Sequence, residues 1–582
     1  MPAVTTESRM RGLIKIRRAK ILLAFLLVAF VAAWLYWSHT VHTDMATYAP
    51  ADCLAFVEAN DLTEVAQGIE GTQAWKALAG PVGARSSLLP NRWFMRLARW
   101  TGIGSAEAIV LTRSQIAIVF TGAEASQAGP TLTIKPLATL VIETHTTQRR
   151  MRPTVEQHIE DLASRVYGQP VFSRKQAAGV ELSQWSSADG SRHIVAAFAG
   201  TVAIIGNDEA SVLRCLEARQ GKRAALANEK QFNELRQKVD AARASVFGFV
   251  SKPGVKSLLQ AFALYRAGSS PDAVTVSRIF SETVGNLVDG LGWSSKFVDA
   301  MVEEHSSITL SPGVADRLRG SFVPEDRLAL GDLPFVPSDA HSVSLYHFRD
   351  VEGVWRDLNS IVASHADLIG AIATRPMLRG LLKPYGIDDA DTFVHAVGTR
   401  LQTIRLEETL PSVLVTEALD RQGLRKVALQ RLGAKPKTES VGEFELLLSS
   451  SDDWAVSFAD NHFLSGPAEA VRRSLQAKVQ SKSLTSTDAF RKSQRLVDVS
   501  LPISVLTFSN DQHAAISFVE IFSEHERSAF SSSAPAIDEA SRSLPYAVSV
   551  VILKDAGLEW TSRSSFGLVG SLLVTLTPET AK

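Results

Sequence analysis

The chain has 582 residues, more than one hydrophobic core normally holds, so two or more domains are expected. With 45% hydrophobic and 21% charged residues, the composition excludes a disordered protein and a multi-span transporter. Lys plus Arg and Asp plus Glu both number 61, so the net charge is zero and no global field attracts nucleic acid. Two short basic stretches, 149–152 and 219–223, flank predicted helices and are expected to be solvated faces, so no nucleic-acid partner is predicted.

The N-terminal segment departs from this balance, because an uncharged apolar run of 17 residues, Ile21–Trp37, follows a basic segment. The basic residues of that segment are Arg9, Arg11, Lys15, Arg17, Arg18 and Lys20. No Lys or Arg follows until Lys76, so the positive-inside rule places residues 1–20 in the cytoplasm and the rest of the chain outside it. At about 1.5 Å per residue the run spans roughly 25 Å, which predicts one transmembrane helix over residues 21–37. A cleaved signal peptide is the alternative, although the run ends in bulky aromatic residues rather than at a small-residue cleavage site.

A short unit of an apolar strand, a polar turn and an amphipathic helix is predicted four times along the chain. The four strand-and-turn segments are Leu54–Asp61, Val246–Pro253, Val343–Asp350 and Val505–Asp511. A Pro-x-Asp motif precedes the first and third units, at Pro50 and Pro337. These two units open two larger copies, and the other two units lie in the second halves of those copies.

A larger module, a hairpin followed by two helices, is predicted twice, about 260 positions apart. Phe198 aligns with Phe458, and Gly206 aligns with Gly466. The turn of the first hairpin contains Gly200 and the turn of the second contains Asp460-Asn461, residue types that tolerate the positive backbone angles of tight turns.

The helices of this module have predicted start signals. Asn207 is expected to cap the first helix of one copy, and Pro467 to occupy the first helical position in the other. Asn228 and the segment 485–488 are expected to cap the second helices, which should end near Asp240 and Asp498.

Two tandem ectodomain copies, residues 48–325 and 335–582, therefore follow the anchor, with a boundary in the Pro- and Gly-bearing segment 323–337. Because each copy mixes hairpins with helices, we predict α+β domains with mainly antiparallel sheets and helices packed on one face. The strands that close the copies are expected at Phe297–Val302, Ser306–Leu310, Tyr546–Leu553 and Leu558–Ser564. Gly122–Pro136 is expected to be a loop and Gly567–Leu576, too short to span a membrane, a strand.

The chain has two cysteines, Cys53 and Cys215. In an oxidising compartment they could form a disulfide. The second copy has Ser474 near the position of Cys215 and no cysteine matching Cys53, so the fold does not require a bridge. Two separate buried thiols are therefore the favoured interpretation, and a disulfide stays open.

The order of these segments resembles a bacterial family of single-pass envelope proteins known only as a domain of unknown function. The resemblance is carried by the strand start Pro50-Ala51-Asp52-Cys53 and by the segments Ala203–Phe232 and Phe463–Phe490. Cys53 stands where the family has a hydroxyl residue. The resemblance implies a location in the bacterial cell envelope and implies no activity or site residues.

The chain contains no Gly-x-Ser-x-Gly, Ser-x-x-Lys, Walker, His-Glu-x-x-His or Cys-x-x-Cys motif, so no catalytic, cofactor-binding or metal-ligating residue is assigned and no cofactor is expected. Weaker candidates are His39 with His42, Glu303-Glu304-His305, Glu524-His525-Glu526, Asp388–Asp391 and Asp452-Asp453. Adjacent strand residues point to opposite faces, so the two Glu/His triplets are expected to be solvated surface. Asp388–Asp391 is better explained as a helix N-terminus than as a calcium loop.

The tryptophans are expected to pack in the core, except for Trp34 and Trp37 of the anchor. The others on predicted apolar faces are Trp75, Trp93, Trp100, Trp355, Trp454 and Trp560. The segment Asn91–Trp100 is the best candidate for an amphipathic helix facing a membrane or a partner.

We expect a membrane-anchored protein of the bacterial inner membrane, with its N-terminus in the cytoplasm and its bulk outside it. Non-enzymatic binding or scaffolding with an envelope protein partner, through the sheet faces or the cleft between copies, is the predicted function. The copies share their apolar skeleton, and none of His145, His193, His305 and His347 has a matched partner. An envelope hydrolase with one active copy and a carrier of lipid or another hydrophobic ligand are the alternatives.

Overall fold

The computed structural model describes residues 42–84, 114–128, 131–145, 148–267, 273–330, 333–365, 378, 380–450, 453–521 and 534–576. Residues Met45–Lys582 group into one compact unit, separate from Met1–Asp44. No helix among the described residues is long and apolar enough to cross a membrane. The predicted span 21–37 lies outside the described residues.

The first half of the described chain contains ten strands. They are β1 (Ala55–Ala59), β2 (Gln115–Ala128), β3 (Thr131–Glu143), β4 (Val171–Ala177), β5 (Val180–Ser186), β6 (His193–Ala199), β7 (Val202–Gly206), β8 (Val246–Ser251), β9 (Val288–Val298) and β10 (Met301–Leu310). Its helices are η1 (Met45–Tyr48), α2 (Leu62–Gly71), α3 (Gln73–Val82), α6 (Gln148–Tyr167), α7 (Glu209–Arg219), η2 (Leu226–Asn228), α8 (Lys230–Lys238), η3 (Ala241–Arg243), α9 (Lys252–Ala267), α10 (Ala273–Gly285) and α11 (Val314–Phe322).

The second half contains ten more strands. They are β11 (Ser342–His347), β12 (Val397–Arg405), β13 (Val413–Ala418), β14 (Lys437–Val441), β15 (Phe444–Leu448), β16 (Trp454–Ala459), β17 (His462–Pro467), β18 (Val505–Ser509), β19 (Ala547–Lys554) and β20 (Gly557–Ser564). Its helices are α12 (Val351–His365), η4 (Lys383–Tyr385), α14 (Ala390–Ala396), α15 (Arg421–Leu432), α16 (Ala468–Gln480), η5 (Leu484–Ser486), α17 (Asp488–Gln494), α18 (Gln512–Ile521), α19 (Ala534–Arg542) and α20 (Gly567–Leu576).

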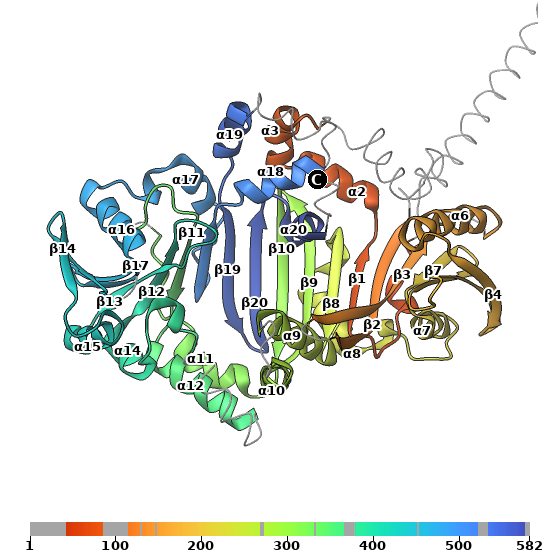
Figure 1. The fold of residues 1–582 in the computed structure, drawn as a ribbon, viewed down its shortest axis with the longest axis horizontal. Coiled ribbons are helices and arrows are strands. Elements are labelled where there is room, and N and C mark those ends of the chain that lie inside the picture. Colours follow the sequence, from red (N-terminus) through yellow and green to blue (C-terminus); the bar gives the residue numbers. More distant parts are fainter. Residues whose placement is uncertain are drawn as a thin grey trace, which may run out of the picture. The chain divides into compact units, whose positions relative to one another are not determined.

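All twenty strands belong to one antiparallel sheet, which confirms the α+β class and the antiparallel pairing (Figure 1). The pairings order the first half as β4-β5-β6-β7-β3-β2-β1-β8-β9-β10. They order the second half as β14-β15-β16-β17-β13-β12-β11-β18-β19-β20. The two orders are the same when ten is subtracted from each strand number of the second half.

The strands of the four strand-turn-helix units lie side by side in each half, seventh and eighth in the order of ten strands. β1 pairs with β8, and β11 pairs with β18, while each strand leads into a helix: α2, α9, α12 or α18. Each Pro-x-Asp turn forms an isolated bridge to the start of a 3-10 helix, Pro50 with Ala225 and Pro337 with Ser483. The sequence units thus occupy equivalent places in the two halves.

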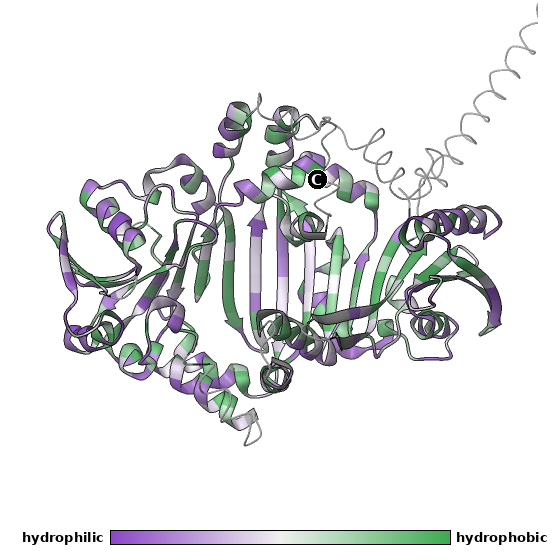
Figure 2. Ribbon diagram, viewed as in Figure 1, coloured by the Kyte–Doolittle hydropathy of each residue, from purple (hydrophilic) through white to green (hydrophobic). Residues whose placement is uncertain are grey.

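Among the described strands, the two halves pair through β10 and β20, which we call the seam, and helices of the two halves also pack together, α3 with α18 and α19. Eight residue pairs are in register along it, from Val302 opposite Ser564 to Thr309 opposite Gly557. The seam strands are more polar than their neighbour: Figure 2 shows purple and white segments along β10 and β20, whereas β19 is largely green. Polar side chains therefore concentrate where the halves meet.

Helices pack on both faces of the sheet, so the prediction of helices on one face is wrong. Val141 of β3 packs in a core cluster with Val212 and Cys215 of α7. Ile142, the next residue, packs in a separate cluster with Met151 of α6. Because neighbouring strand residues point to opposite faces, α6 and α7 cover opposite sides of the same strands.

The predicted tight turns are confirmed. Gly200 has φ 67° and Asp460 has φ 52°, each in the two-residue turn between paired strands. The predicted cap Asn207 is wrong, because the side chain of Asp208 accepts the Ser211 N–H at 2.8 Å and caps α7. The side chain of Asn207 instead bonds the backbone of Pro136 and Ala138.

The second helix of the module starts differently in the two halves. Thr487 caps α17 by accepting the Phe490 N–H, within the predicted capping segment. Asn228 does not cap α8, because Glu229 holds the cap position without a side-chain bond. Both helices end earlier than predicted, at Lys238 and Gln494.

Three other predictions are wrong. Most of Gly122–Pro136, expected to be a loop, extends the β2–β3 pairing as far as Ala128 opposite Thr131. Gly567–Leu576 is the helix α20 rather than a strand. The turn between β9 and β10 lies at Asp299-Ala300, so the expected break near residues 303–305 is instead the middle of β10.

The aligned glycines Gly206 and Gly466 mark close approaches between strands. A Cβ at Gly206 would lie 2.8 Å from Val212 Cγ2 and 3.2 Å from the Ala138 carbonyl oxygen. A Cβ at Gly466 would lie 3.0 Å from Val413 Cα. The absence of a side chain thus lets β7 and β17 pack against β3 and β13.

We expect Gly206→Ala and Gly466→Ala each to lower the free energy of unfolding by about 1–3 kcal/mol, because the crowded atoms include backbone or buried groups. Gly320→Ala in α11 is the control, since a Cβ there meets nothing within 4 Å and should add up to about 1 kcal/mol. Urea unfolding of the three variants measures both effects. Equal stability of all three would contradict the close approach.

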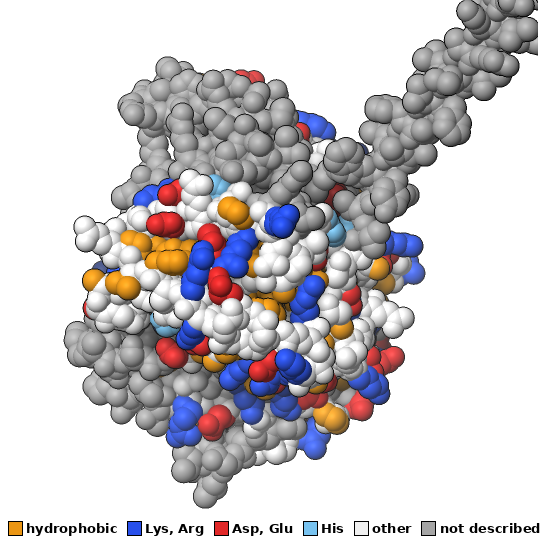
Figure 3. Space-filling model, turned by 90° about the vertical axis from the view of Figure 1, so that its right-hand side faces the viewer, with side chains coloured by type: hydrophobic (Ala, Val, Ile, Leu, Met, Phe, Trp, Pro, Cys, Tyr) orange, Lys and Arg blue, Asp and Glu red, His pale blue; other side chains and the backbone are white. Residues whose placement is uncertain are grey.

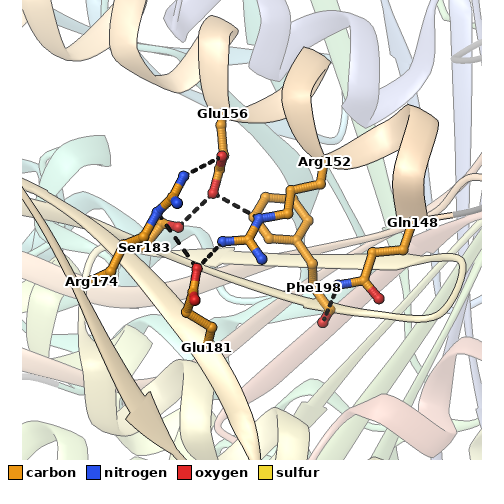
Figure 4. Close-up of polar contacts among 7 residues, drawn as sticks. All are labelled: Gln148, Arg152, Glu156, Arg174, Glu181, Ser183 and Phe198. Carbon is orange, nitrogen blue, oxygen red and sulfur yellow. Dashed lines mark hydrogen bonds and ion pairs between the residues drawn. The ribbon is translucent and has the colours of Figure 1, made fainter.

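An ion-pair network fixes α6 on the sheet (Figure 4). Glu156 accepts from Arg152 at 3.0 Å and from Ser183 at 2.6 Å, and Glu181 bonds Arg152 as well. Arg174 of β4 adds a bond to Glu156 at 3.0 Å. Acidic and basic side chains are intermixed on this side of the molecule, with apolar side chains between them (Figure 3).

Two arginines of the basic stretches form ion pairs with carboxylates. Arg152 pairs as above, and Arg223 pairs with Asp52 at 3.2 Å and with Glu217 at 3.5 Å. Arg219 lies over the Tyr48 ring.

The two cysteines are free, buried thiols in the same core cluster. Burial raises the pKa of each thiol to about 12, and the neighbouring Cys215 contributes to the rise at Cys53. The favoured interpretation of two unjoined thiols is therefore the arrangement in the structure.

Candidate functional site

A cavity of about 360 Å³ lies at the seam, and we call it the seam pocket. The first half contributes residues of β9 and β10, and the second half contributes residues of α18, β19, β20 and α20. The lining residues are Trp293, Glu304, Ser306, Asp511, Ala514, Phe518, Ala547, Trp560, Ser562, Ser564, Phe566, Gly567, Leu568, Gly570 and Ser571. The pocket is thus formed by both halves together.

Strand alternation places the polar residues of the seam in two groups on opposite faces. Glu304 lies opposite Ser562, and Ser306 lies opposite both Trp560 and Trp293, so these side chains share the pocket face. The intervening residues Glu303 and His305 point to the other face. There the pairs are Glu303 with Arg563 and Lys296, and His305 with Glu559.

Aromatic rings form much of the pocket wall. Trp293 is nearly buried, whereas the side chain of Trp560 is 47% exposed at the rim. The rings of Phe518 and Phe566 stack with centroids 4.0 Å apart. These rings offer an apolar surface, and Trp560 is accessible to a ligand.

Glu304 is a buried carboxyl that holds the start of α20. Its oxygens accept the Leu568 N–H at 2.6 Å and the Ser562 hydroxyl at 3.1 Å. Burial raises the pKa of Glu304 above its usual range, although hydrogen bonds from Leu568, Ser562 and Trp293 oppose the rise. No charged group of the described residues contributes to this shift.

Asp511 is the second carboxyl, at the turn between β18 and α18. Its Oδ2 accepts the Ser565 N–H at 2.9 Å, which ties the start of α18 to the segment before α20. Its Oδ1 is buried and has no hydrogen-bond partner among the described residues. Burial raises the pKa of Asp511, against the hydrogen bonds from Ser565, and again no charged group contributes.

The equivalent positions of the first half carry different chemistry. Aligned on their strands, Asp511 corresponds to Lys252, which pairs with Asp289 at 2.6 Å. Aligned on the Asp-Ala turns of the two hairpins, Glu304 corresponds to Trp560. The pocket residues therefore have no counterpart set elsewhere in the sheet.

The lining of the pocket has no Lys, Arg, His or Cys among the described residues. Nor do three His, Cys, Asp or Glu side chains of the described chain come together in a way that could hold a metal ion. The arrangement offers acceptors, hydroxyls and aromatic faces. Its chemistry suits a ligand that donates hydrogen bonds and has an apolar surface.

The structure separates the triplet Glu303-Glu304-His305 as strand alternation predicts, but the expectation of a solvated surface is wrong for Glu304, which is 9% exposed. Asp388–Asp391 is confirmed as a helix start, because Asp389 caps α14 by accepting the Thr392 N–H. His42 is exposed. Candidates that lie wholly or partly outside the described residues are His39, Asp452, Glu524-His525-Glu526 and the segment Asn91–Trp100.

Core packing is confirmed for Trp75 and Trp454, which are 2% and 7% exposed, and is wrong for Trp560. Asp511 was not predicted as a site residue. Two signals could have indicated it: it stands where the equivalent unit of the first half has Lys252, and it lies in the turn that follows β18.

Comparison with protein-family models, with curated proteins and with solved structures finds no match to this chain.

Proposed function

We propose that this chain is an extracytoplasmic binding protein, anchored in the bacterial inner membrane, whose ligand site is the seam pocket. The observation that carries the proposal is Asp511 Oδ1, a buried acceptor without a described partner in a cavity walled by aromatic rings. An unpaired buried oxygen costs about 1–3 kcal/mol, which a ligand that supplies a donor would recover. A pocket of about 360 Å³ is of a size typical for small-molecule sites.

The proposed location rests on the N-terminal sequence. A basic segment before the apolar run Ile21–Trp37 supports a single anchor with residues 1–20 in the cytoplasm. The bulk of the chain, including the seam pocket, would then face the extracytoplasmic space, where an envelope partner or a small molecule is met.

We take the two halves to be copies of one ancestral module. Their common strand order, their matched Pro50 and Pro337 bridges and their matched glycines support this view. A site formed once, where the copies meet, accounts for the lack of any polar pair common to both. Duplication would supply the scaffold, and later divergence at Asp511 and Glu304 would supply the site.

A hydrolase is the second candidate, because enzymes that hydrolyse by acid catalysis commonly use two carboxyl groups in one pocket. That chemistry needs one carboxyl ionised while the other is protonated, and burial raises the pKa of both Glu304 and Asp511. A binding function accounts for the two carboxyls better than hydrolysis does. Turnover of chromogenic ester, phosphate, peptide or glycoside substrates would favour the hydrolase.

A substitution that fills the pocket tests the binding function. Ala514→Trp adds a ring at an exposed lining position of α18, and His513→Trp adds the same ring at the adjacent exposed position outside the lining. Native mass spectrometry of the full chain, released from its own envelope, should show a bound small molecule in wild type and His513→Trp and none in Ala514→Trp. Equal retention by both variants, or no bound molecule in wild type, would contradict the proposal.

A further inference from the structure

Not every carboxyl oxygen of the seam pocket accepts a hydrogen bond from the described residues. Glu304 has its oxygens occupied by Leu568 and Ser562, and Asp511 has one oxygen occupied by Ser565. Among the described side chains that line the pocket, Asp511 Oδ1 is the one buried polar atom without a hydrogen-bond partner. A ligand that fits here must therefore bring a hydrogen-bond donor to this oxygen.

The charge of that donor follows from what surrounds the two carboxyls. No Lys, Arg or His lies in the described lining, and no charged group contributes to the pKa of either carboxyl. An anionic ligand would meet two carboxyls and no cation. A cationic ligand would meet an acceptor that no side chain of the described lining neutralises.

The walls suit the same kind of ligand. The face of an indole ring attracts a cation within about 6 Å, more strongly where water is excluded. Trp293 is almost fully buried and Trp560 is half-exposed, so one ring is inside the pocket and the other is at its rim. An aromatic wall beside an unpaired carboxyl is the usual environment of ammonium groups in proteins.

The rim adds an apolar surface. Leu568 and Leu572 of α20 are 46% and 49% exposed, one helical turn apart, and Leu568 belongs to the pocket lining. These side chains offer contact to the remainder of a ligand whose charged end lies inside.

We propose that the seam pocket binds an organic cation, a protonated amine or quaternary ammonium attached to an apolar body, with Asp511 as the residue that receives the charge. This inference rests on the proposed binding function and specifies its ligand class. Burial favours the neutral form of the empty Asp511 carboxyl, and a bound cation would restore the carboxylate.

Calorimetric titration of the full chain in nanodiscs tests the class with three probes of one shape: phenethylamine, 2-phenylethanol and 3-phenylpropionate. The amine should bind at least tenfold more tightly than the alcohol, and the propionate should not bind. Asp511→Asn should remove the preference for the amine. Trp560→Leu, at a half-exposed position whose loss leaves the core intact, should weaken binding of N,N,N-trimethylphenethylammonium severalfold.

Equal affinity for the amine and the alcohol, or preference for the propionate, would overturn the cation class while leaving the pocket a binding site. If no probe binds although a small molecule co-purifies with the wild type, the cation class is likewise overturned and the pocket remains a binding site. If no probe binds and no molecule co-purifies, both proposals fail. Retained amine preference in Asp511→Asn, with a folded protein by circular dichroism, would overturn the role of Asp511.

Discussion

Gly557→Ala is expected to lower the free energy of unfolding by about 3 kcal/mol or more, because it disrupts the seam that joins the two halves. A Cβ at Gly557 would lie 2.0 Å from the Ile308 carbonyl oxygen and 3.0 Å from the Leu310 nitrogen. Both atoms belong to the backbone of β10, so no side-chain rotation relieves the overlap. The pairing of β10 with β20 must open at this end instead.

Scanning calorimetry measures this effect, with Gly71→Ala at the end of α2 as the control because a Cβ there meets nothing within 4 Å. The seam variant should melt roughly 5 °C or more below wild type, and the control should melt close to it. A seam variant as stable as the control would mean that the β10–β20 pairing contributes little to the fold.

Asp511→Asn is expected to stabilise the protein while it removes the preference for a cationic ligand. The amide keeps an oxygen for the Ser565 N–H and removes a carboxylate from a buried position without a cation. The gain at pH 8 should be on the order of 1 kcal/mol, because a buried polar group without a partner costs about this much. Opposite effects on stability and binding are the mark of a functional residue.

The pH dependence of that gain follows from the direction of the pKa shift. The folded-state pKa of Asp511 is raised, so its contribution to stability is fully present below the ordinary Asp pKa of about 3.9 and is lost as pH rises through the raised value. The Asn side chain of Asp511→Asn does not ionise, so this variant does not lose stability in this way as the pH rises. The difference in melting temperature between variant and wild type should therefore be largest near pH 8 and vanish near pH 4 and below.

Asp538→Asn, an exposed acid on α19, is the control and should show no pH-dependent gain. A destabilised Asp511→Asn at pH 8 would mean that the carboxylate, rather than the neutral acid, is the favoured form in the pocket.

Local signals predicted much of the fold correctly. The four strand-turn-helix units and the tight turns at Gly200 and Asp460 depend on residues close together in sequence, and all of them are present. The aligned glycines Gly206 and Gly466 proved to be close approaches between strands. Backbone conformation and strand crowding leave such marks in a single sequence.

Long-range contacts account for what was missed. The seam pairs Glu304 with Ser562, 258 residues apart, and no local pattern reports such a pairing. The apolar run Gly567–Leu576 fits a strand by composition, but Leu568 at its start donates to Glu304 and the segment forms α20. Tertiary contacts decide between helix and strand in short apolar runs.

Only part of the candidate site could be predicted from the sequence. Alternation along β10 correctly separated Glu304 from Glu303 and His305, yet the burial of Glu304 depends on β20 and α20. In the sequence, Asp511 has the features of an ordinary turn residue. That one of its oxygens lacks a hydrogen-bond partner is known only from the folded structure, where Asp511 lines the pocket together with residues of β10 and α20. A site that residues of both halves form together cannot be recognised from the sequence of either half alone.

The central claim, that the seam pocket is where this protein binds its ligand, is tested most directly by a crystal structure of the chain purified from the cells that produce it naturally. The account predicts difference density between Trp293 and Trp560, within hydrogen-bond distance of Asp511 Oδ1. A bound molecule located at any other surface, with this pocket filled only by water, would contradict it.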